Sequence, residues 1–251
     1  MRVLPSVSAE QVPDVLEAAL RQGEVELTGR FTFGSNYTFL VTVHYEGQEI
    51  PAVYKPSRGE QPLWDFPEST LARREVAAYI VSQALGFNFV PLTVLRDDIP
   101  TYGAGSLQQF IDHDPDYHYF SFSPEDKMRL PAVVLFDVLV NNADRKGSHI
   151  LIEKETGKLW AIDHGLCFHE EDKLRTVLWD FAGEAIPDKL LPCGAALPTM
   201  LDAGAELRAA LQPYLEPGEI AALARRARRL VSAGIFPSPP RDRRAFPYPP
   251  I

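Results

Sequence analysis

Two aspartates follow apolar segments in the second half of the chain. Asp144 comes after the apolar run 130–140. About twenty positions after Asp144, Asp163 ends a β-rich stretch and is followed by a glycine turn. Transfer of a γ-phosphoryl group needs one carboxylate near the attacking hydroxyl and a second that holds the divalent ion on the phosphates. We therefore predict that Asp144 is catalytic and that Asp163 binds metal. Arg145 and Lys146, counted with the catalytic residues, would either stabilise the transferring oxygens or balance local acids.

Residues suited to phosphate binding lie earlier in the chain. Lys55 ends a β-rich stretch and Glu75 lies in the next helical segment, so the glutamate is expected to hold the lysine against the α- and β-phosphates. The turn Gly34, Ser35 and Asn36 joins two β-rich stretches and would lay backbone N–H groups over the phosphates. Each feature is common alone, but their order along the chain predicts an ATP site.

The elements that must position these residues change in character near residue 112. Before it, a helix is followed by β-rich stretches, a second helix and two more strands, which together predict an antiparallel sheet with one helix inserted. The expected elements are a helix from Ser8 to Gly23, strands at 29–32, 37–45 and 50–54, a helix from Ser69 or Thr70 to Gly86, and strands at 90–95 and 107–111.

After residue 112 the pattern is mainly helical. Ser123 is expected to cap a helix that runs to Val140, followed by a hairpin at 150–153 and 159–163 and by mixed loop and helix to Gly234. Strands followed by helices indicate an α+β fold rather than alternating βαβ units. We divide the chain into an N-lobe (1–112), a C-lobe (113–236) and a Pro-rich extended tail (237–251).

Composition excludes several classes of protein. A chain of 251 residues with 45% apolar content can bury the core of one domain or two lobes. Its net charge of −9 disfavours binding to nucleic acid or to anionic membranes. The run 130–140 is too short to span a bilayer, and no membrane span or signal peptide is expected. Two cysteines, Cys167 and Cys193, make no disulfide framework, so a reducing cytoplasm is the expected location.

The loop residues also carry a resemblance. The segment from Asp144 to His149, DRKGSH, followed by IDHG from Ile162 to Gly165, resembles the catalytic and metal-binding loops of phosphatidylinositol 3-/4-kinase-like atypical kinases, and more distantly those of HipA-like kinases. Those families show Asp-Arg-His with an Asn five residues after the Asp, and then Asp-Phe-Gly. The resemblance implies a bilobal protein-kinase-like fold over most of the chain, with ATP and Mg²⁺ as cofactors.

The resemblance also implies roles for further residues. It places a hinge, whose backbone would meet adenine, at Gln108, Gln109, Phe110 and Ile111. It makes His149 the second metal ligand, where those families have Asn. Imidazole favours transition metals over magnesium, so Mn²⁺ is an alternative ion.

The expected reaction is transfer of the γ-phosphate of ATP to a hydroxyl of a protein or a small polar metabolite. The acidic run 170–172 does not suit an inositol-lipid headgroup. Three alternatives stay open. The chain could be a nucleotide-binding pseudokinase or scaffold, given His149. It could be a two-metal phosphohydrolase, or the two aspartates could be ordinary turn and cap residues. The phosphohydrolase ligands would be Asp144, His149, Asp163, His164 and His169.

Overall fold

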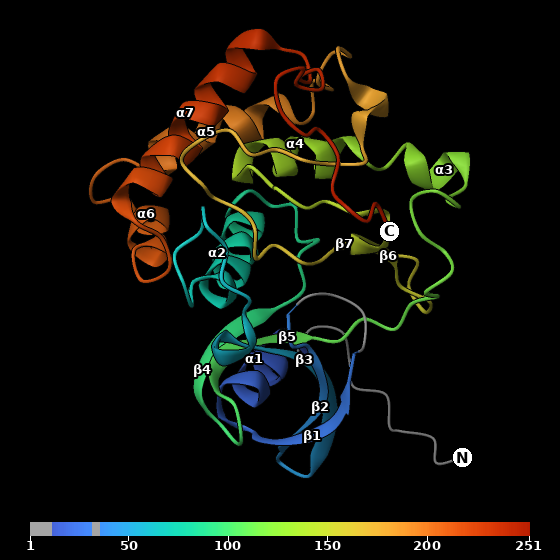
Figure 1. Ribbon diagram of the computed structural model, residues 1–251, viewed down its shortest axis with the longest axis vertical. Coiled ribbons are helices and arrows are strands. Elements are labelled where there is room, and N and C mark those ends of the chain that lie inside the picture. The colour runs from blue at the N-terminus through green and yellow to red at the C-terminus, as the bar shows by residue number, and fades with distance from the viewer. Residues whose placement is uncertain (1–11, 32–35) are drawn as a thin grey trace. The chain divides into compact units, whose positions relative to one another are not determined.

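The chain forms two compact units in a computed structural model that describes residues 12–31 and 36–251 (Figure 1). The first unit comprises Met1–Gln61 with Leu92–Phe110, and the second comprises Pro62–Pro91 with Ile111–Ile251. The chain passes for the last time from the first unit to the second between Phe110 and Ile111. The units differ from the expected lobes in that residues 62–91, expected in the N-lobe, and the expected tail 237–251 both belong to the second unit. The expected Ser8 cap lies outside the described residues.

The first unit is built on a five-stranded antiparallel sheet with the strand order β1-β2-β3-β5-β4. Helix α1 contacts strands β2, β4 and β5. The elements are α1 (Val12–Gln22), β1 (Glu24–Arg30), β2 (Phe39–Tyr45), β3 (Gln48–Pro56), β4 (Thr93–Ile99) and β5 (Gly103–Gln109).

Buried and more exposed side chains alternate along strands of this sheet such as β2, so one face of the sheet lies on the core. On β2, Phe39, Val41 and Val43 are buried while the residues between them are partly exposed, as expected for a strand with one face on the core. Three of the expected strands lie a few residues from where the sequence pattern put them, because β1 begins at Glu24, β4 at Thr93 and β5 at Gly103. Residues 90 and 91 precede β4, and the sharp turn after it is closed by Gly103, whose positive φ of 77° suits a residue without a β-carbon.

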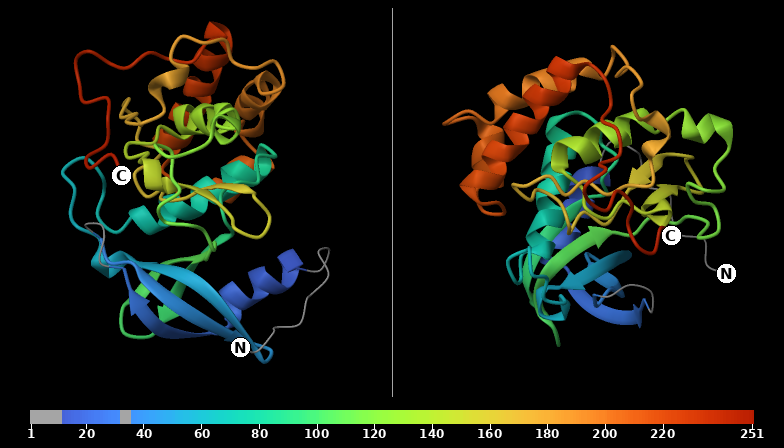
Figure 2. Two further views of the ribbon diagram at one scale, coloured as in Figure 1. Left: turned by 90° about the vertical axis from the view of Figure 1, so that its right-hand side faces the viewer. Right: turned by 45° about the horizontal axis from the view of Figure 1, so that its top comes forward.

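The second unit is mainly helical (Figure 2), with a small two-stranded hairpin. Helices α5 and α7 pack side by side, and α7 also contacts α4. The elements are α2 (Leu71–Ala84), α3 (Pro124–Lys127), α4 (Pro131–Val140), β6 (Ile150–Ile152), β7 (Leu159–Ala161), α5 (Leu191–Met200), α6 (Glu206–Leu211) and α7 (Pro217–Ala233), with short 3-10 helices at Gly147–His149 and Trp179–Phe181.

The helix expected from Ser123 to Val140 is two helices. The Ser123 side chain does cap α3, because its hydroxyl accepts a hydrogen bond from the N–H of Asp126. Pro131 then starts a new helix, since proline fits the first turn of a helix but interrupts its interior. Helix α4 is almost entirely apolar and buried, with Asp137 as its buried acidic residue.

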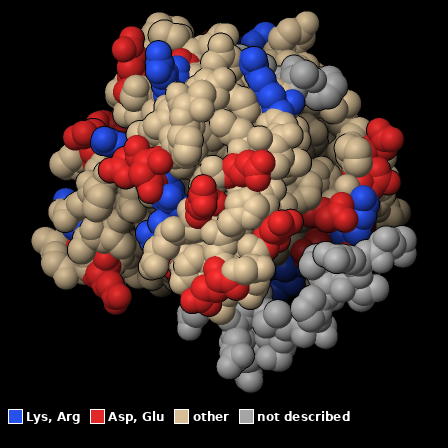
Figure 3. All heavy atoms as spheres, turned by 90° about the horizontal axis from the view of Figure 1, so that it is seen from below, with Lys and Arg blue, Asp and Glu red and all other residues tan. Residues whose placement is uncertain are grey.

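Within the described ranges, no helix combines the length and apolar character needed to cross a membrane. Acidic side chains are spread over the molecular face in Figure 3, with basic side chains among them. The basic residues of this face form no continuous patch among the described residues, which agrees with the net charge of −9.

Candidate active site

The loop that carries Asp144 begins where helix α4 ends. Asn141 adopts a left-handed conformation with φ of 58°, which ends the helix and turns the chain. Its side-chain amide donates to the carbonyls of His169 and Glu171, at 2.9 and 2.6 Å. The Asn142 side chain accepts the N–H of Asp144 at 2.9 Å and donates to Asp137 at 3.0 Å. Both asparagines thus shape the loop from inside the second unit.

Asp144 lies partly buried at this loop, with 26% of its side chain exposed. Burial raises the pKa of its carboxyl to about 6, and the charge of Asp163 adds to this effect, while Lys146 and Arg145 oppose it. The Lys146 ammonium stands 3.5 Å from one Asp144 oxygen. The loop therefore holds a carboxyl that is a stronger base than an ordinary aspartate, beside a cation.

Arg145 points into the core. Its guanidinium makes two hydrogen bonds to the Asp137 carboxylate, at 2.8 and 2.9 Å, and is fully buried with it. It also donates to the carbonyls of His149 and Ile162, at 3.1 and 2.7 Å. Of the two roles considered for Arg145, these bonds favour the balancing of a local acid over contact with the transferring oxygens, because this guanidinium is buried and occupied by Asp137 and two carbonyls. Arg145 is a positioning residue.

The remaining hydrogen bond of the Arg145 guanidinium determines which ring nitrogen of His164 carries no proton. Arg145 Nη2 donates to His164 Nε2 at 2.8 Å. Because arginine stays protonated, this ring nitrogen of His164 must be the acceptor and carries no proton. Arg145 therefore connects helix α4, the loop of Asp144 and both residues that flank Asp163.

The backbone of the Asp144 loop is paired as well. Arg145 N–H donates to the Arg175 carbonyl at 3.0 Å, and Val177 N–H donates to the Arg145 carbonyl at 3.1 Å. The Arg175 N–H donates to the Asn142 carbonyl at 2.9 Å. A short parallel ladder thus ties the loop to the segment 175–177.

Asp163 follows β7 in a left-handed conformation with φ of 62°. Its side chain is 46% exposed, and one carboxylate oxygen lies 3.1 Å from His149 Nε2. The next residue, His164, donates its N–H to the buried carboxylate of Glu75 at 2.9 Å. Helix α2 therefore holds the backbone next to Asp163 through Glu75. The predicted role of Glu75 toward Lys55 stays a prediction.

Helix α2 is anchored by a second charged residue that sequence reasoning missed. Arg74 is buried and donates to Glu219 of α7 at 2.5 Å and to the Cys167 carbonyl at 2.6 Å. Glu219 also accepts the N–H of Glu216, which closes a capping box at the start of α7. A charged residue within an otherwise apolar helical segment is the sequence feature that could have indicated Arg74 as a buried, paired charge. The same feature could have indicated Asp137.

The donor set near Asp163 suits a magnesium ion carried by a nucleotide. Among the described residues, no three His, Cys, Asp or Glu side chains gather into a metal-binding group. Mg²⁺ commonly takes only one or two carboxylates and completes its shell with phosphate oxygens and water. The exposed Asp163 carboxylate fits that use, and the Asp144 carboxyl is its acidic neighbour.

The same geometry argues against a two-metal phosphohydrolase. His164 is buried and its Nε2 accepts from Arg145, so it does not face a metal together with Asp144. The His169 ring stacks edge-on to Phe66, with ring centroids 5.3 Å apart. Its Nδ1 accepts the N–H of Glu171. The five proposed ligands do not form one site.

The residues predicted to bind phosphate in the first unit are only partly described. Gly34 and Ser35 lie outside the described residues. The Asn36 side chain accepts the N–H of Gln61 at 2.7 Å, so it joins the segment before β2 to the segment after β3. Lys55 lies near the end of β3, in register with Ser106 of β5. Its role toward phosphates stays a prediction.

The predicted hinge lies where the chain passes from the first unit to the second. The Gln108 side chain is buried and donates to the Thr93 hydroxyl at 2.8 Å. The N–H groups of Gln109 and Phe110 donate to carbonyls within the first unit. Ile111 packs with Leu151 and Trp160, in the second unit. Contact of this segment with adenine stays a prediction.

Replacing Arg145 should be costly for stability. In Arg145→Met the Asp137 carboxylate stays buried without its partner, so we expect a loss of about 3–5 kcal/mol in the free energy of unfolding. Urea titration measures this loss. The exposed Arg228→Met should change stability by less than about 0.5 kcal/mol, and Arg145→Met with Asp137→Leu should recover part of the loss. Equal stability of Arg145→Met and Arg228→Met would contradict the role of Arg145.

The raised pKa of Asp144 predicts a stability change that depends on pH. A raised pKa means that ionisation of Asp144 costs stability as the pH rises from about 4 through about 6. Asp144→Asn should therefore be more stable than the parent chain at pH 8, by roughly 1–3 kcal/mol, and equal to it near pH 4. The exposed Asp97→Asn is the control and should show no such trend.

Comparison with known proteins gives this site a family. The model of the phosphatidylinositol 3- and 4-kinase family matches residues 70–205, which include Glu75, Asp144 and Asp163. The Mycobacterium tuberculosis protein Rv2133c is 40% identical over 267 aligned positions, covering 92% of this chain and 94% of that protein. Phosphatidylinositol 4-kinase gamma 4 of Arabidopsis thaliana is 34% identical over 134 positions, which cover 43% of this chain and 23% of the plant protein.

A solved structure has the same fold. The crystal structure of the Helicobacter pylori proinflammatory kinase CtkA matches with a TM-score of 0.55 and 12% identity, covering 86% of this chain and 94% of that chain. This likeness confirms the α+β, bilobal protein-kinase-like fold. The family model spans more than half of the chain, and the residues of the Asp144 and Asp163 loops lie within it. The chain is a member of the phosphatidylinositol 3- and 4-kinase family.

Proposed function

We propose that this kinase transfers the γ-phosphoryl group of ATP to a hydroxyl, with Asp144 next to the acceptor and Asp163 on the divalent ion. The observation that carries this proposal is the Asp144 carboxyl, whose pKa is raised to about 6 by burial and by the charge of Asp163. A general base is most effective when its pKa lies near the working pH. Asp144 is thus the described carboxyl best suited to accept the hydroxyl proton.

The neighbours of Asp144 support this assignment. Lys146 lies 3.5 Å from its carboxylate and can balance charge beside the transferring group. The Asp163 carboxylate would bind Mg²⁺, which neutralises the phosphate oxygens. In the first unit, Lys55 is the proposed ligand of the α- and β-phosphates. The turn residues Gly34, Ser35 and Asn36 are proposed contacts of the phosphates through their backbone N–H groups. The segment 108–111 is the adenine contact that the family resemblance implies.

The acceptor is proposed to be a protein hydroxyl or a small polar metabolite. The segment 169–173, which follows the Asp163 loop, holds three acidic residues at 170–172 and a single lysine. That lysine, Lys173, is buried, with its ammonium 3.1 Å from Glu171 and 3.4 Å from Asp65. Its charge is therefore already matched. A segment of this kind offers no basic contact to the phosphates of an inositol-lipid headgroup.

Turnover of ATP tests the proposal. Asp144→Asn and Asp163→Asn should each lower kcat for MgATP by about a hundredfold or more, since general base and metal ligand are lost. Loss of ³²P from γ-labelled ATP measures kcat, and the exposed Asp97→Asn is the matched control. For the parent chain, kcat/KM should fall below about pH 6 as Asp144 becomes protonated.

Lys55→Met separates a kinase from a hydrolase that does not use this residue. In a kinase the variant should weaken ATP binding or abolish turnover, because the phosphates lose a cation. The proposal would be overturned if the parent chain bound no MgATP, or if Asp144→Asn turned over at the parental rate.

A nucleotide-binding pseudokinase is the second candidate, because His149 stands where related kinases have Asn. Its Nε2 lies 3.1 Å from Asp163, so an imidazole occupies the neighbourhood where a second oxygen ligand would be needed. An amide oxygen binds Mg²⁺ better than an imidazole does.

His149→Asn should therefore raise turnover with Mg²⁺ several-fold, and it should reduce any preference for Mn²⁺. Rates with each ion, measured at matched saturation, provide the test. Binding of ATP without turnover in the parent chain, under either ion, would favour the pseudokinase. An unchanged metal preference in His149→Asn would show that His149 does not influence the ion.

A further inference from the structure

The last residues of the chain lie along the loop that follows the metal-binding aspartate. In Figure 1 the red segment runs down to the hairpin β6–β7, where the C-terminus lies. The Arg243 guanidinium donates to the Leu174 carbonyl and to the Asp172 carboxylate, both at 2.7 Å. The Ala245 carbonyl accepts the N–H of Thr176 at 3.1 Å. The Pro-rich tail is therefore hydrogen-bonded to the segment 172–176.

A further bond connects the tail to the catalytic loop itself. The Pro250 carbonyl accepts the N–H of Gly147 at 2.8 Å, three residues after Asp144. A β-carbon at Gly147 would lie 2.8 Å from the ring of Phe120, so this position has no room for another side chain. Pro247 is buried between exposed neighbours and anchors the stretch that leads to this bond.

These bonds continue the ladder described above. The loop residue Arg145 pairs with the segment 175–177, and Thr176 of that segment pairs in turn with Ala245. The indole N–H of Trp179 reaches the same Ala245 carbonyl, at 3.0 Å. The Asp144 loop, the segment 175–177 and the tail thus run next to one another in the second unit, and each is hydrogen-bonded to the next.

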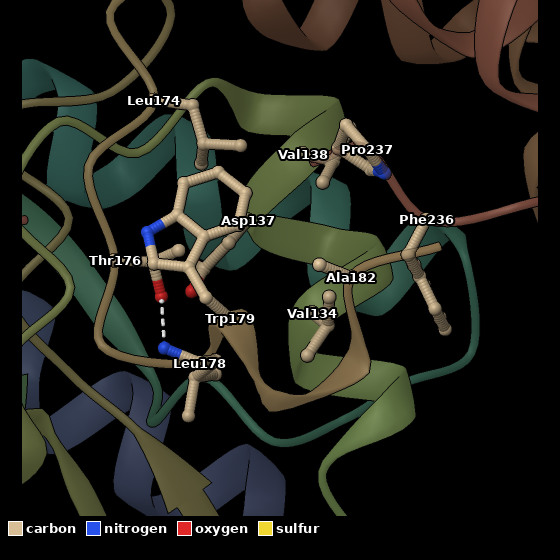
Figure 4. Close-up of a pocket in the computed structure, with 10 residues that line it drawn as sticks. All are labelled: Val134, Asp137, Val138, Leu174, Thr176, Leu178, Trp179, Ala182, Phe236 and Pro237. Carbon is tan, nitrogen blue, oxygen red and sulfur yellow. Dashed lines mark hydrogen bonds between the residues drawn. The ribbon is translucent and has the colours of Figure 1, made fainter. Parts of the chain in front are cut away.

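The beginning of the tail is fixed to helix α4. Phe236 and Pro237 line a small, mostly apolar pocket together with Val134 and Val138 of α4 (Figure 4). Trp179 forms the opposite part of its lining. The tail thus borders a pocket shared with α4 at its start and is hydrogen-bonded to Gly147 near its end.

We propose that residues 237–251 are a positioning segment of the active site, which keeps the Asp144 loop and the segment 172–179 in the geometry needed for phosphoryl transfer. The inference rests on the proposed phosphotransferase activity. A loop becomes more mobile when its N–H groups lose a protein acceptor and bond to water instead. A displacement of about 1 Å at a reacting group can lower the reaction rate about a hundredfold. The tail binds no nucleotide in this proposal, so its loss should change kcat and not the affinity for ATP.

Deletion of residues 241–251 tests the inference. We expect kcat for MgATP to fall about tenfold or more, while the Kd for MgATP measured by calorimetric titration stays within about twofold. Addition of a synthetic peptide of residues 241–251 should restore part of the lost turnover. Rescue by a peptide would not occur if the deletion had simply unfolded the protein.

A point variant supplies a milder test. Arg243→Ala removes the bonds to Leu174 and Asp172 and should lower kcat several-fold, whereas the exposed Arg241→Ala should not. Hydrogen exchange gives a readout independent of activity, since the amides of Gly147 and Thr176 should exchange faster in the deletion variant. Arg243→Lys should behave in between, because one ammonium cannot reproduce both bonds.

The outcomes are distinguishable. A full chain that binds no MgATP overturns the proposed function and this inference with it. A full chain that turns over ATP at the same rate as the deletion variant overturns the inference alone. Faster turnover in the deletion variant also overturns it, and assigns an inhibitory role to the tail.

Discussion

The buried pair of Asp137 and Arg145 is the interaction on which the rest of the site depends. Two hydrogen bonds join them inside the second unit, and the same guanidinium holds the carbonyls that precede β6 and follow β7. Breaking such a pair leaves an uncompensated charge in the interior, which proteins tolerate poorly. The pair therefore fixes the separation of the loops that carry Asp144 and Asp163, although neither of its members touches the reacting atoms.

Asp144 and Asp163, the two aspartates proposed to act in phosphoryl transfer, differ because their surroundings differ. Asp144 is partly buried beside another acid, so its carboxyl holds a proton more strongly than usual, whereas Asp163 is the more exposed of the two. A metal ligand needs an accessible charge, and a general base needs a pKa near the working pH. Under the proposed mechanism, the site would obtain two chemistries from one residue type by placing it in two environments, at the expense of some stability.

Sequence patterns predicted the order of the elements, the antiparallel sheet and the positions of Asp144 and Asp163 in loops, because these follow from local periodicity and turn residues. The direction of the Arg145 side chain did not follow, since an irregular loop has no periodicity that assigns its residues to a face. Membership of α2 in the second unit rests on contacts between residues far apart in sequence, such as the bond of Arg74 to Glu219. The bond from Gly147 to Pro250 has no local signal either.

The position of the last residues also matters for anyone who handles this protein. Pro250 is bonded to the loop of Asp144, and Ile251 is exposed beside it. An affinity tag or fused partner attached after Ile251 would begin next to the residue that is bonded to Gly147 in the Asp144 loop. A label attached there would report motions of that loop, and a purification handle belongs elsewhere on the chain.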